Sequence, residues 1–334
     1  MPDQTASTAA GSADHPLVRV YRTAALIHRT DERMRSMLTS GELAAAYYSP
    51  RGQETVAAAL AHSGVTTDDY LVTTYRGIHD QIAKGMPLDL LIAEIFGKAT
   101  GACKGKGGPM HVTHPDTGVM VTTGIVGSGL PIAVGLATSS DIRKDGRVTI
   151  VCFGDGASNI GAFHESLNLA SLWNLPVVFV CQNNLYAEST SYANGTTAAH
   201  IADRAAGYGM PGVTVDGNDP QAALDVFTSA VDRARAGDGP TLVEAVTYRF
   251  MGHYFGDPGA YMDREEYDKA LAADPVPALR AALLERGLAD EDRMSTWEQQ
   301  IADEVERAIT FAIESPYPGA DELRLDVYRE QVSA

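Results

Sequence analysis

The chain of 334 residues has a formal net charge of −17, with 26 lysines and arginines against 43 aspartates and glutamates. This acidic balance argues against nucleic acid and anionic membrane surfaces as partners, because both require a basic face. Hydrophobic residues make up 45% of the chain, but no apolar run approaches the roughly 18 residues of a membrane span. The composition therefore predicts a globular protein with a substantial core.

The start of the chain and its cysteines bear on where the protein works. Residues 1–15 are small and polar and lack both a basic start and an apolar stretch, so a flexible tail is expected there rather than a secretory signal. Cys103, Cys152 and Cys181 are odd in number and lack metal-ligand spacing. Reduced cysteines are typical of the cytoplasm, which is the predicted location.

The predicted elements alternate between helices and strands. Helices are expected over residues 16–40, from about 53, and over 130–139, 160–173 and 220–236. Strands are expected over residues 69–74, 148–153, 177–181, 213–215 and 241–248. The glycine-rich stretch 97–129 is long for a loop and is expected to be functional or to contain short elements. We predict an α/β fold in which helices flank a mostly parallel sheet, as a single domain over 16–334 with a helical C-terminal region from about 262.

Two of these strands end in polar residues that could share a ligand. Residues 148–153 and 177–181 are apolar runs typical of parallel strands that are buried on both faces. The helix between them is expected to be capped by Ser158. Because both strands of such a unit run in the same direction, Asp155 and Asn184 are expected at the same carboxyl edge of the sheet.

That edge has the chemistry of a magnesium-diphosphate site. Open parallel sheets bind ligands at the carboxyl ends of their strands, and glycines on both sides of Asp155 let the main chain approach a ligand closely. The following helix offers free N–H groups to a phosphate. Carboxylate, amide and carbonyl oxygens suit magnesium or calcium rather than zinc or copper. Asp155 alone would be an ordinary turn residue, but its pairing with Asn184 favours metal ligation.

These residues resemble the thiamine diphosphate-binding motif, which Gly154-Asp155-Gly156 opens and Asn183-Asn184 closes. Four further blocks resemble the alpha subunit of thiamine-dependent dehydrogenases: Tyr75-Arg76-Gly77, Gly105 to His111, Gly124 to Gly127, and Tyr248 to His253. That subunit belongs to the first component of 2-oxo acid and acetoin dehydrogenase complexes, and the acetoin and pyruvate branch is the most similar. The resemblance spans about 18–262 and is specific as a set, although a lone Gly-Asp-Gly would be weak.

The resemblance implies a role for each matching position. Magnesium is expected at Asp155, Asn184 and the main-chain carbonyl of Tyr186. The cofactor-binding residues implied are Tyr75, Arg76, Gly124, Val126, Gly154, Asp155, Gly156, Ala157, Asn184, Arg249 and His253. The planar fork of Arg76 suits phosphate oxygens. Without the resemblance Arg76 would be a surface arginine, Val126 a packing residue and His253 an exposed loop histidine.

The resemblance also implies cofactors and partners. The cofactors are thiamine diphosphate and Mg²⁺, with the cofactor carrying the difficult chemical step. In the family, the glutamate that activates the cofactor belongs to a separate beta subunit, so this chain would supply only half of an active site. The expected assembly contains two alpha and two beta chains. A lipoyl-bearing acyltransferase would receive the acyl group.

Tyr48 departs from the family pattern. Many relatives have a histidine four residues before the glycine of the block that is Gly52-Gln53-Glu54 here. A phenol is a poor proton shuttle near neutral pH because its reference pKa is about 10. Tyr48 and His253 are nevertheless the predicted catalytic residues. Tyr254 and Tyr261 stand where the mitochondrial pyruvate enzyme has regulatory serines, so control by a serine kinase is not expected at these positions.

The sequence is compatible with three functions. The first is an alpha subunit that decarboxylates a pyruvate-like 2-oxo acid or cleaves acetoin and passes the acyl group to a lipoyl carrier. The second is a two-chain decarboxylase or carboligase without a lipoyl acceptor, which Tyr48 keeps open. The third is a nucleotide-binding protein with a structural Gly-Asp-Gly turn, which the lack of a P-loop disfavours. Lys104 and Lys106 fit an anion patch or a solvated loop equally well, and His79 is expected to be structural.

Overall fold

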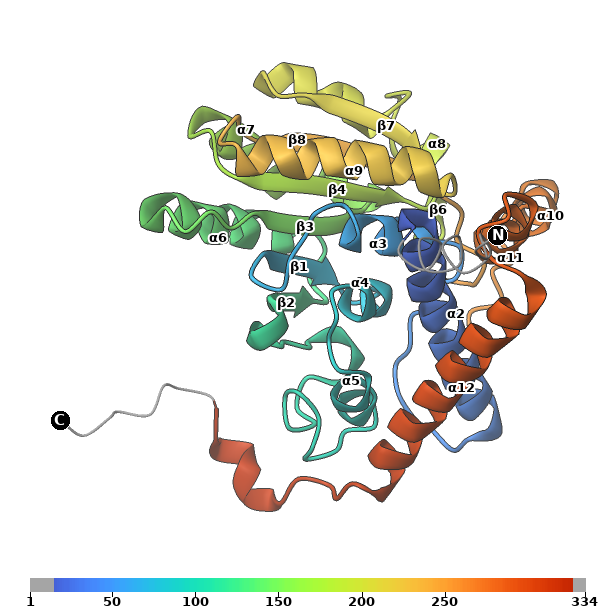
Figure 1. The fold of residues 1–334 in the computed structure, drawn as a ribbon. Coiled ribbons are helices and arrows are strands. Elements are labelled where there is room, and N and C mark those ends of the chain that lie inside the picture. Colours follow the sequence, from blue (N-terminus) through green and yellow to red (C-terminus); the bar gives the residue numbers. More distant parts are fainter. Residues whose placement is uncertain (1–14, 327–334) are drawn as a thin grey trace, which may run out of the picture.

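The computed structural model describes residues 15–326. Its centre is a six-stranded sheet in the order β2-β1-β3-β4-β8-β7, in which every neighbouring pair is parallel (Figure 1). The strands are β1 (Tyr70–Thr74), β2 (Val119–Thr123), β3 (Thr149–Gly154), β4 (Val177–Asn183), β7 (Gly212–Asp216) and β8 (Thr241–Val246). The predicted α/β fold is confirmed. The tail predicted for residues 1–15 lies, apart from His15, outside the described residues.

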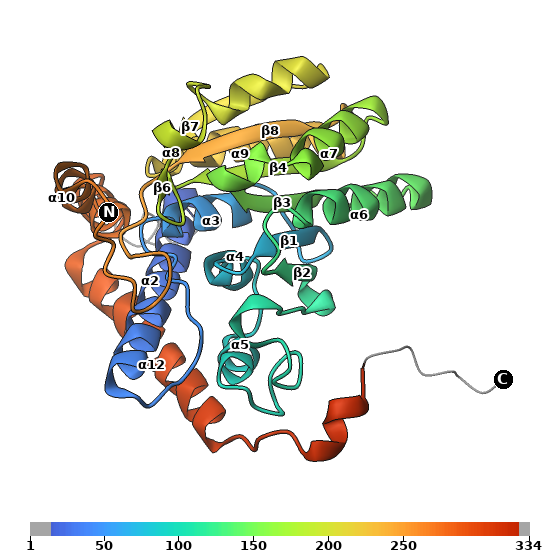
Figure 2. The ribbon, with the colours of Figure 1, turned by 180° about the vertical axis from the view of Figure 1, so that it is seen from behind.

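Helices cover both faces of this sheet. They are α3 (Glu54–Ala61), α4 (Ile78–Ala83), α6 (Gly129–Arg143), α7 (Gly161–Leu172) and α9 (Pro220–Arg235). Helix α5 (Leu88–Ile95) lies beyond the β2 edge of the sheet (Figure 1). Helix α9 lies over the face seen in Figure 1, and α7 lies over the face seen in Figure 2. Ile150 and Cys152 of β3 pack towards α3 and α9, whereas Val151 and Phe153 pack towards α6 and α7. Burial on both faces explains why β3 is apolar throughout.

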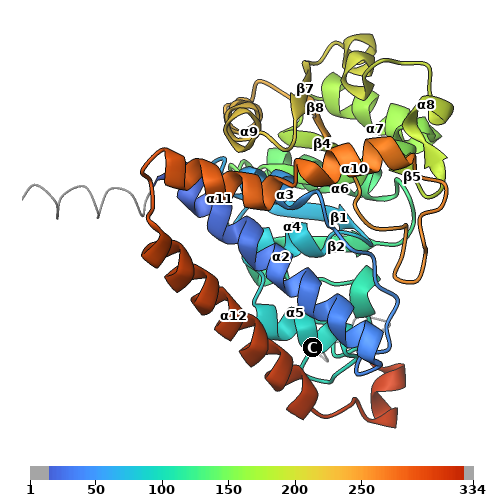
Figure 3. The ribbon, with the colours of Figure 1, turned by 90° about the vertical axis from the view of Figure 1, so that its right-hand side faces the viewer.

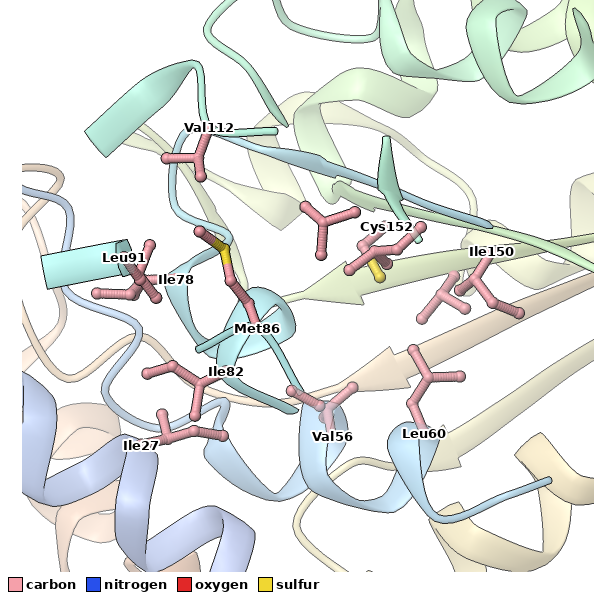
Figure 4. Close-up of a cluster of buried hydrophobic side chains, with 14 of the residues drawn as sticks. Ile27, Val56, Leu60, Ile78, Ile82, Met86, Leu91, Val112, Ile150 and Cys152 are labelled. Atoms are coloured by element: carbon pink, nitrogen blue, oxygen red, sulfur yellow. The ribbon is translucent and has the colours of Figure 1, made fainter. Parts of the chain in front are cut away.

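The larger apolar cluster joins the sheet to the N-terminal half of the chain. Figure 4 shows Val56 and Leu60 of α3 beside Ile150 of β3, with Ile78 of α4 and Ile27 of α2 (Pro16–Ser40) further along the same cluster. All of these side chains are buried. Burying one side chain of this size stabilises the fold by roughly 1.5–3 kcal/mol. The cluster therefore helps to hold β3, whose carboxyl end lies at the candidate site, in place.

The C-terminal helices pack against the start of the chain. They are α10 (Arg264–Ala272), α11 (Pro275–Glu285) and α12 (Glu291–Glu314), followed by the short turn η5 (Ala320–Arg324). Helix α12 packs against α2 and α5, and the two long helices α2 and α12 lie side by side in Figure 3. Met294 and Trp297 of α12 meet Leu17 and Tyr21 of α2 in a separate apolar cluster. Within residues 15–326, no helix has the length and apolar character required to cross a membrane.

The prediction that Ser158 caps the helix after β3 is wrong. Residues Asp155–Asn159 form a tight turn, η3, and α7 begins only at Gly161, with extended Ile160 before it. The turn brings the Ser158 hydroxyl to the carbonyl of Asp155, to which it donates at 2.7 Å. The chain therefore leaves β3 through a turn that surrounds Asp155 rather than directly into a helix.

Several short elements escaped the sequence analysis. Strand β2 and two turns, η1 (Gly108–Met110) and η2 (Pro115–Thr117), lie within the glycine-rich stretch, where short elements were expected. Helices α4 and α5 were not predicted. After β4 come a hairpin of β5 (Tyr186–Ala187) and β6 (Thr190–Ser191), then α8 (Tyr192–Gly195) and η4 (Ile201–Tyr208). The hairpin forms one wall of the candidate site.

Candidate functional site

A cavity of about 420 Å³ opens at the carboxyl ends of β1, β3 and β4. Its walls contain every residue that the sequence predicts to be catalytic, to bind the cofactor or to bind metal. These are Tyr48, Tyr75, Arg76, Gly124, Val126, Gly154, Asp155, Gly156, Ala157, Asn184, Tyr186, Arg249 and His253. Parallel strands deliver these residues from separate loops to one edge, where such sheets bind ligands. The structure thus brings together the complete predicted set, although the role of each residue stays a prediction.

Asp155 and Asn184 follow neighbouring strands, as expected. Strands β3 and β4 pair in parallel with Gly154 opposite Gln182, which brings both side chains to the same edge. Asp155 is only 6% exposed and forms no ion pair within the described residues. Burial raises the pKa of its carboxyl to about 6, although the positive charge of Arg249 opposes the shift. The buried carboxylate is therefore available to a cation.

Gln53 belongs to this cavity and was missed as a site residue. Its Oε1 accepts a hydrogen bond of 3.0 Å from Nδ2 of Asn184, while Oδ1 of Asn184 accepts from the main-chain N–H of Tyr186 at 3.3 Å. Nε2 of Gln53 is buried and has no partner within the described residues. A buried donor without an acceptor is costly unless a ligand satisfies it. The Gly-Gln-Glu block was the sequence signal that could have identified Gln53.

Arg76 brings a buried positive charge to the cavity. It is 6% exposed, and burial, reinforced by the charge of Arg249, lowers its pKa to about 10. The guanidinium donates to the carbonyls of Ser49 at 2.7 Å and His253 at 2.8 Å. It forms no ion pair within residues 15–326 and keeps N–H groups that have no acceptor there. Such a group is suited to an anionic ligand.

Arg249 is the second buried cation, and it is 1% exposed. It donates to the carbonyls of Tyr186 at 3.2 Å and Glu188 at 2.7 Å, and thereby holds the β5–β6 hairpin. It also donates to the carbonyl of Met251 at 3.1 Å and the hydroxyl of Tyr261 at 2.7 Å. Most of its donors thus bind this chain, and the carbonyl of Tyr186, the third predicted metal ligand, already accepts one hydrogen bond.

Three aromatic rings form another wall of the cavity. The centroids of Tyr48 and Tyr75 lie 4.6 Å apart, and those of Tyr48 and His253 lie 5.4 Å apart, both edge to face. Burial and the positive charges of Arg76 and Arg249 hold the pKa of His253 below its usual value of 6.5. Nδ1 of His253 lies 3.4 Å from Nη2 of Arg76, which can only donate. The proton of neutral His253 therefore sits on Nε2.

Other singled-out residues lie outside the cavity wall. Lys106 pairs with Glu322 and Asp326, each at 2.7 Å, and Lys104 pairs with Asp326 at 2.9 Å. The two lysines are thus bound by the C-terminal segment. His79 is fully buried, with Nδ1 at 3.1 Å from the carbonyl of Arg76 and Nε2 at 3.1 Å from Oε1 of Gln182. Its expected structural role agrees with these contacts.

The donor set fits a cation bound to an anion. The residues described contain no cluster of three or more histidine, cysteine, aspartate or glutamate side chains that could hold a metal. A single buried carboxylate beside amide and carbonyl oxygens is instead suited to Mg²⁺, which retains other oxygen ligands from water or phosphate. The two buried arginines and the unpaired Nε2 of Gln53 favour an anion. Fold and site are therefore those of an α/β protein whose sheet edge is suited to an anionic ligand together with a hard cation.

Comparisons with known proteins identify the family. The family described as the dehydrogenase E1 component matches residues 21–321, and the chain belongs to it. The chain is 42% identical to the alpha subunit of acetoin:2,6-dichlorophenolindophenol oxidoreductase of Bacillus subtilis, over 92% of each protein. It is 39% identical to the subunit of the same name from Cupriavidus necator, over 93% of this chain and 94% of the relative. The pyruvate dehydrogenase E1 component subunit alpha of Porphyra purpurea is 34% identical, over 93% and 92%.

Proposed function

We propose that this chain is the alpha subunit of a thiamine diphosphate-dependent dehydrogenase. Its substrate would be a pyruvate-like 2-oxo acid or acetoin, and the acyl group would pass to a lipoyl carrier. The family match and the named relatives support an alpha subunit of this kind. The observation that carries the proposal is the pair of buried arginines, Arg76 and Arg249, in one cavity with the unpaired carboxylate of Asp155.

The diphosphate end of the cofactor would lie at the strand ends. Asp155, Asn184 and the carbonyl of Tyr186 would hold Mg²⁺, and Arg76 would face the phosphate oxygens. The remaining predicted contacts come from Tyr75, from the main chain of Gly124 and Val126, and from Gly154, Gly156 and Ala157. When bound, thiamine diphosphate supplies the nucleophilic carbon that attacks the substrate carbonyl and accepts the electrons of the broken bond.

Neutral His253 would act as a hydrogen-bond donor in this site. Arg76 faces Nδ1, so the N–H of Nε2 is the group that His253 can offer to a ligand. The hydroxyl of Tyr48 offers a second donor on the same wall. A phenol holds its proton near neutral pH, so Tyr48 would orient a polar group rather than transfer a proton.

A partner chain would complete the site. Val126 is 52% exposed and Ile125 is 70% exposed, both on the cavity wall, so the packing role considered for Val126 is not met within this chain. Apolar side chains in this position fit a surface that another subunit covers. We propose a beta subunit that carries the activating glutamate, in an assembly of two alpha and two beta chains that works in the cytoplasm. A lipoyl-bearing acyltransferase would be the next partner.

Replacing Asp155 tests the proposal. Asp155→Asn keeps the size of the side chain but removes the charge that would bind Mg²⁺. We expect the magnesium-dependent affinity of the alpha and beta pair for thiamine diphosphate, measured by calorimetry, to fall by more than about a hundredfold. Asp216→Asn is the matched control, because Asp216 also ends a parallel strand but is exposed and outside the cavity. Undiminished binding by Asp155→Asn would refute the metal assignment.

Tyr48 favours one alternative, a two-chain decarboxylase or carboligase without a lipoyl acceptor. The phenol on the aromatic wall can donate a hydrogen bond but cannot shuttle a proton as a histidine would. Assays of the pair with 2-oxo acids and acetoin, with and without a lipoyl domain, separate the two functions. Acyl transfer that depends on the lipoyl domain supports the dehydrogenase, whereas aldehyde or acyloin formation at equal rates without it supports the alternative.

A further inference from the structure

We infer that His79 and Asp80 form a buried imidazolium–carboxylate pair beneath the cavity. As positioning residues, they orient two residues of the cavity wall, Arg76 and Gln182. Both members of the pair belong to the first turn of α4, and they are 0% and 3% exposed. Neither lines the cavity, so they act through the wall residues that they contact. The inference goes beyond the proposed function, because it concerns the ligand-free chain.

The carboxylate of Asp80 contacts residues of two strands. Oδ2 accepts the hydroxyl of Thr73, near the end of β1, at 2.5 Å. Oδ1 accepts Nε2 of Gln182, near the end of β4, at 2.7 Å. Both partners line the cavity, and β3 lies between their strands in the sheet. Asp80 therefore connects two residues of the cavity wall across the central strand.

This contact determines the orientation of the Gln182 amide. An ionised carboxylate can only accept hydrogen bonds, so the NH₂ group of Gln182 faces Asp80. The amide oxygen, Oε1, then faces Nε2 of His79 at 3.1 Å. Because an amide oxygen also can only accept, His79 donates from Nε2.

The second ring nitrogen of His79 faces another acceptor. Nδ1 lies 3.1 Å from the main-chain carbonyl of Arg76, which has no hydrogen to donate. A neutral imidazole carries one N–H, whereas this ring has an acceptor within reach of each nitrogen. A proton on both nitrogens satisfies both contacts, and the ring is then positively charged.

A neutral arrangement would place the proton on Asp80, with the Gln182 amide turned over. Carboxyl groups have a reference pKa of about 3.9 and imidazoles one of about 6.5, so the proton favours the ring. Nε2 of His79 lies 3.6 Å from Oδ1 of Asp80, so each buried charge has a counter-charge. Asp80 forms no other ion pair within residues 15–326. Cys152 stays neutral, because burial and the charge of Asp80 raise the pKa of its thiol.

The charged pair controls which groups the cavity wall offers to a ligand. His79 occupies Oε1 of Gln182, and the second N–H of this amide has no acceptor among the described residues. The ring also binds the carbonyl of Arg76, whose guanidinium lines the cavity. N–H donors held in this way complement an anion or a carbonyl oxygen. The pair thus orients donors at the wall without entering the cavity.

The ring protons of His79 test this inference. In heteronuclear NMR spectra of the ligand-free full-length chain at pH 7, His79 should show two ring N–H signals. Asp80→Asn removes the counter-charge, so we expect the Nε2 proton signal to be lost and the Nδ1 proton signal to remain. The side-chain amide signals of Gln182 should shift in the same variant. Asp89→Asn is the matched control, because Asp89 also lies in the first turn of a helix but outside the cavity.

The wild-type spectrum is decisive without any variant. A single ring N–H signal for His79 at pH 7 would overturn the charged pair, as would two signals that persist in Asp80→Asn. Gln182 signals that do not move in Asp80→Asn would overturn the positioning role. All of these measurements use the ligand-free chain, so a failure to bind thiamine diphosphate would refute the proposed function and leave this test intact.

Discussion

His253 shows how neighbouring residues set the chemistry of one side chain. Its ring is half-buried and lies beside Arg76, with Arg249 contributing a second positive charge. Desolvation and positive charge both disfavour the protonated imidazole. Above pH 6.5 His253 is therefore neutral. Because the Arg76 guanidinium faces Nδ1, the ring proton lies on Nε2.

A titration of His253 checks this account. The imidazole signal of the ligand-free full-length chain, followed by NMR, should titrate below pH 6.5, because its pKa is held down. Arg76→Gln removes one cause, so the midpoint should move upward. Arg147→Gln is the control, because Arg147 lies outside the cavity. A wild-type midpoint at or above 6.5, or no movement in Arg76→Gln, would contradict the assignment.

Glu94 shows how one helix shapes a loop. This residue of α5 is fully buried, and its carboxylate accepts the N–H groups of Cys103, Gly105, Gly107 and Gly108 at 2.7 to 3.1 Å. No cation contacts the carboxylate within the described residues. The glycine-rich loop is therefore folded around one acceptor, and it leads to Met110 on the cavity wall.

Glu94→Gln should unfold more easily. The glutamine amide would place its NH₂ group where a carboxylate oxygen of Glu94 accepts main-chain N–H groups of the loop. At least one buried N–H donor would then lose its acceptor. We expect the free energy of unfolding to fall by roughly 2 kcal/mol in urea titrations. Asp89→Asn, in the same helix but only half-buried, is the control. Equal stability of Glu94→Gln and the wild type would show that the buried charge of Glu94 does not stabilise the fold.

The sequence predicted the residues of the cavity better than it predicted the contacts that hold them in place. Asp155 and Asn184 were predictable because apolar strands and their polar ends follow local rules of burial and direction. Gln53 was missed because it meets Asn184 only through the tertiary fold. The supposed cap at Ser158 failed because a tight turn around Asp155 displaced the start of the helix. The loop contacts of Glu94 also depend on main-chain N–H groups, which no residue pattern specifies.

Arg51 connects residues that lie far apart in the sequence. Its guanidinium donates to Glu54 at the start of α3 and to Asp274 just before α11. Glu54 is fully buried, and its other oxygen accepts the N–H of Gly52 at 2.7 Å. Burial alone would raise the pKa of Glu54, but the nearby ring of His28, with Nδ1 at 3.6 Å, and the charge and hydrogen bond of Arg51 lower it to about 2. The C-terminal helices are thereby joined to the sheet layer.

The stability of the whole chain should depend on the charge of Glu54. Because the pKa falls from 4.5 in the unfolded chain to about 2, its contribution is complete above pH 4.5 and is lost as the pH falls towards 2. Glu54→Gln should lower the free energy of unfolding by on the order of 3 kcal/mol at pH 7, and by progressively less below pH 4.5. Urea titrations at pH 7, 4 and 3 measure this, with exposed Glu304→Gln as control. A deficit that stays constant with pH would refute the role of the charge.

The exposed pair Ile125 and Val126 has a consequence for the cell that makes the protein. If the proposed beta subunit covers them, a chain synthesised in excess of that partner would display these apolar side chains at an open cavity, where they would favour aggregation. Matched production of the two chains, or assembly during synthesis, would keep that surface covered. In the proposed assembly, the supply of the two chains would therefore have to be balanced because of two side chains at the rim of one cavity.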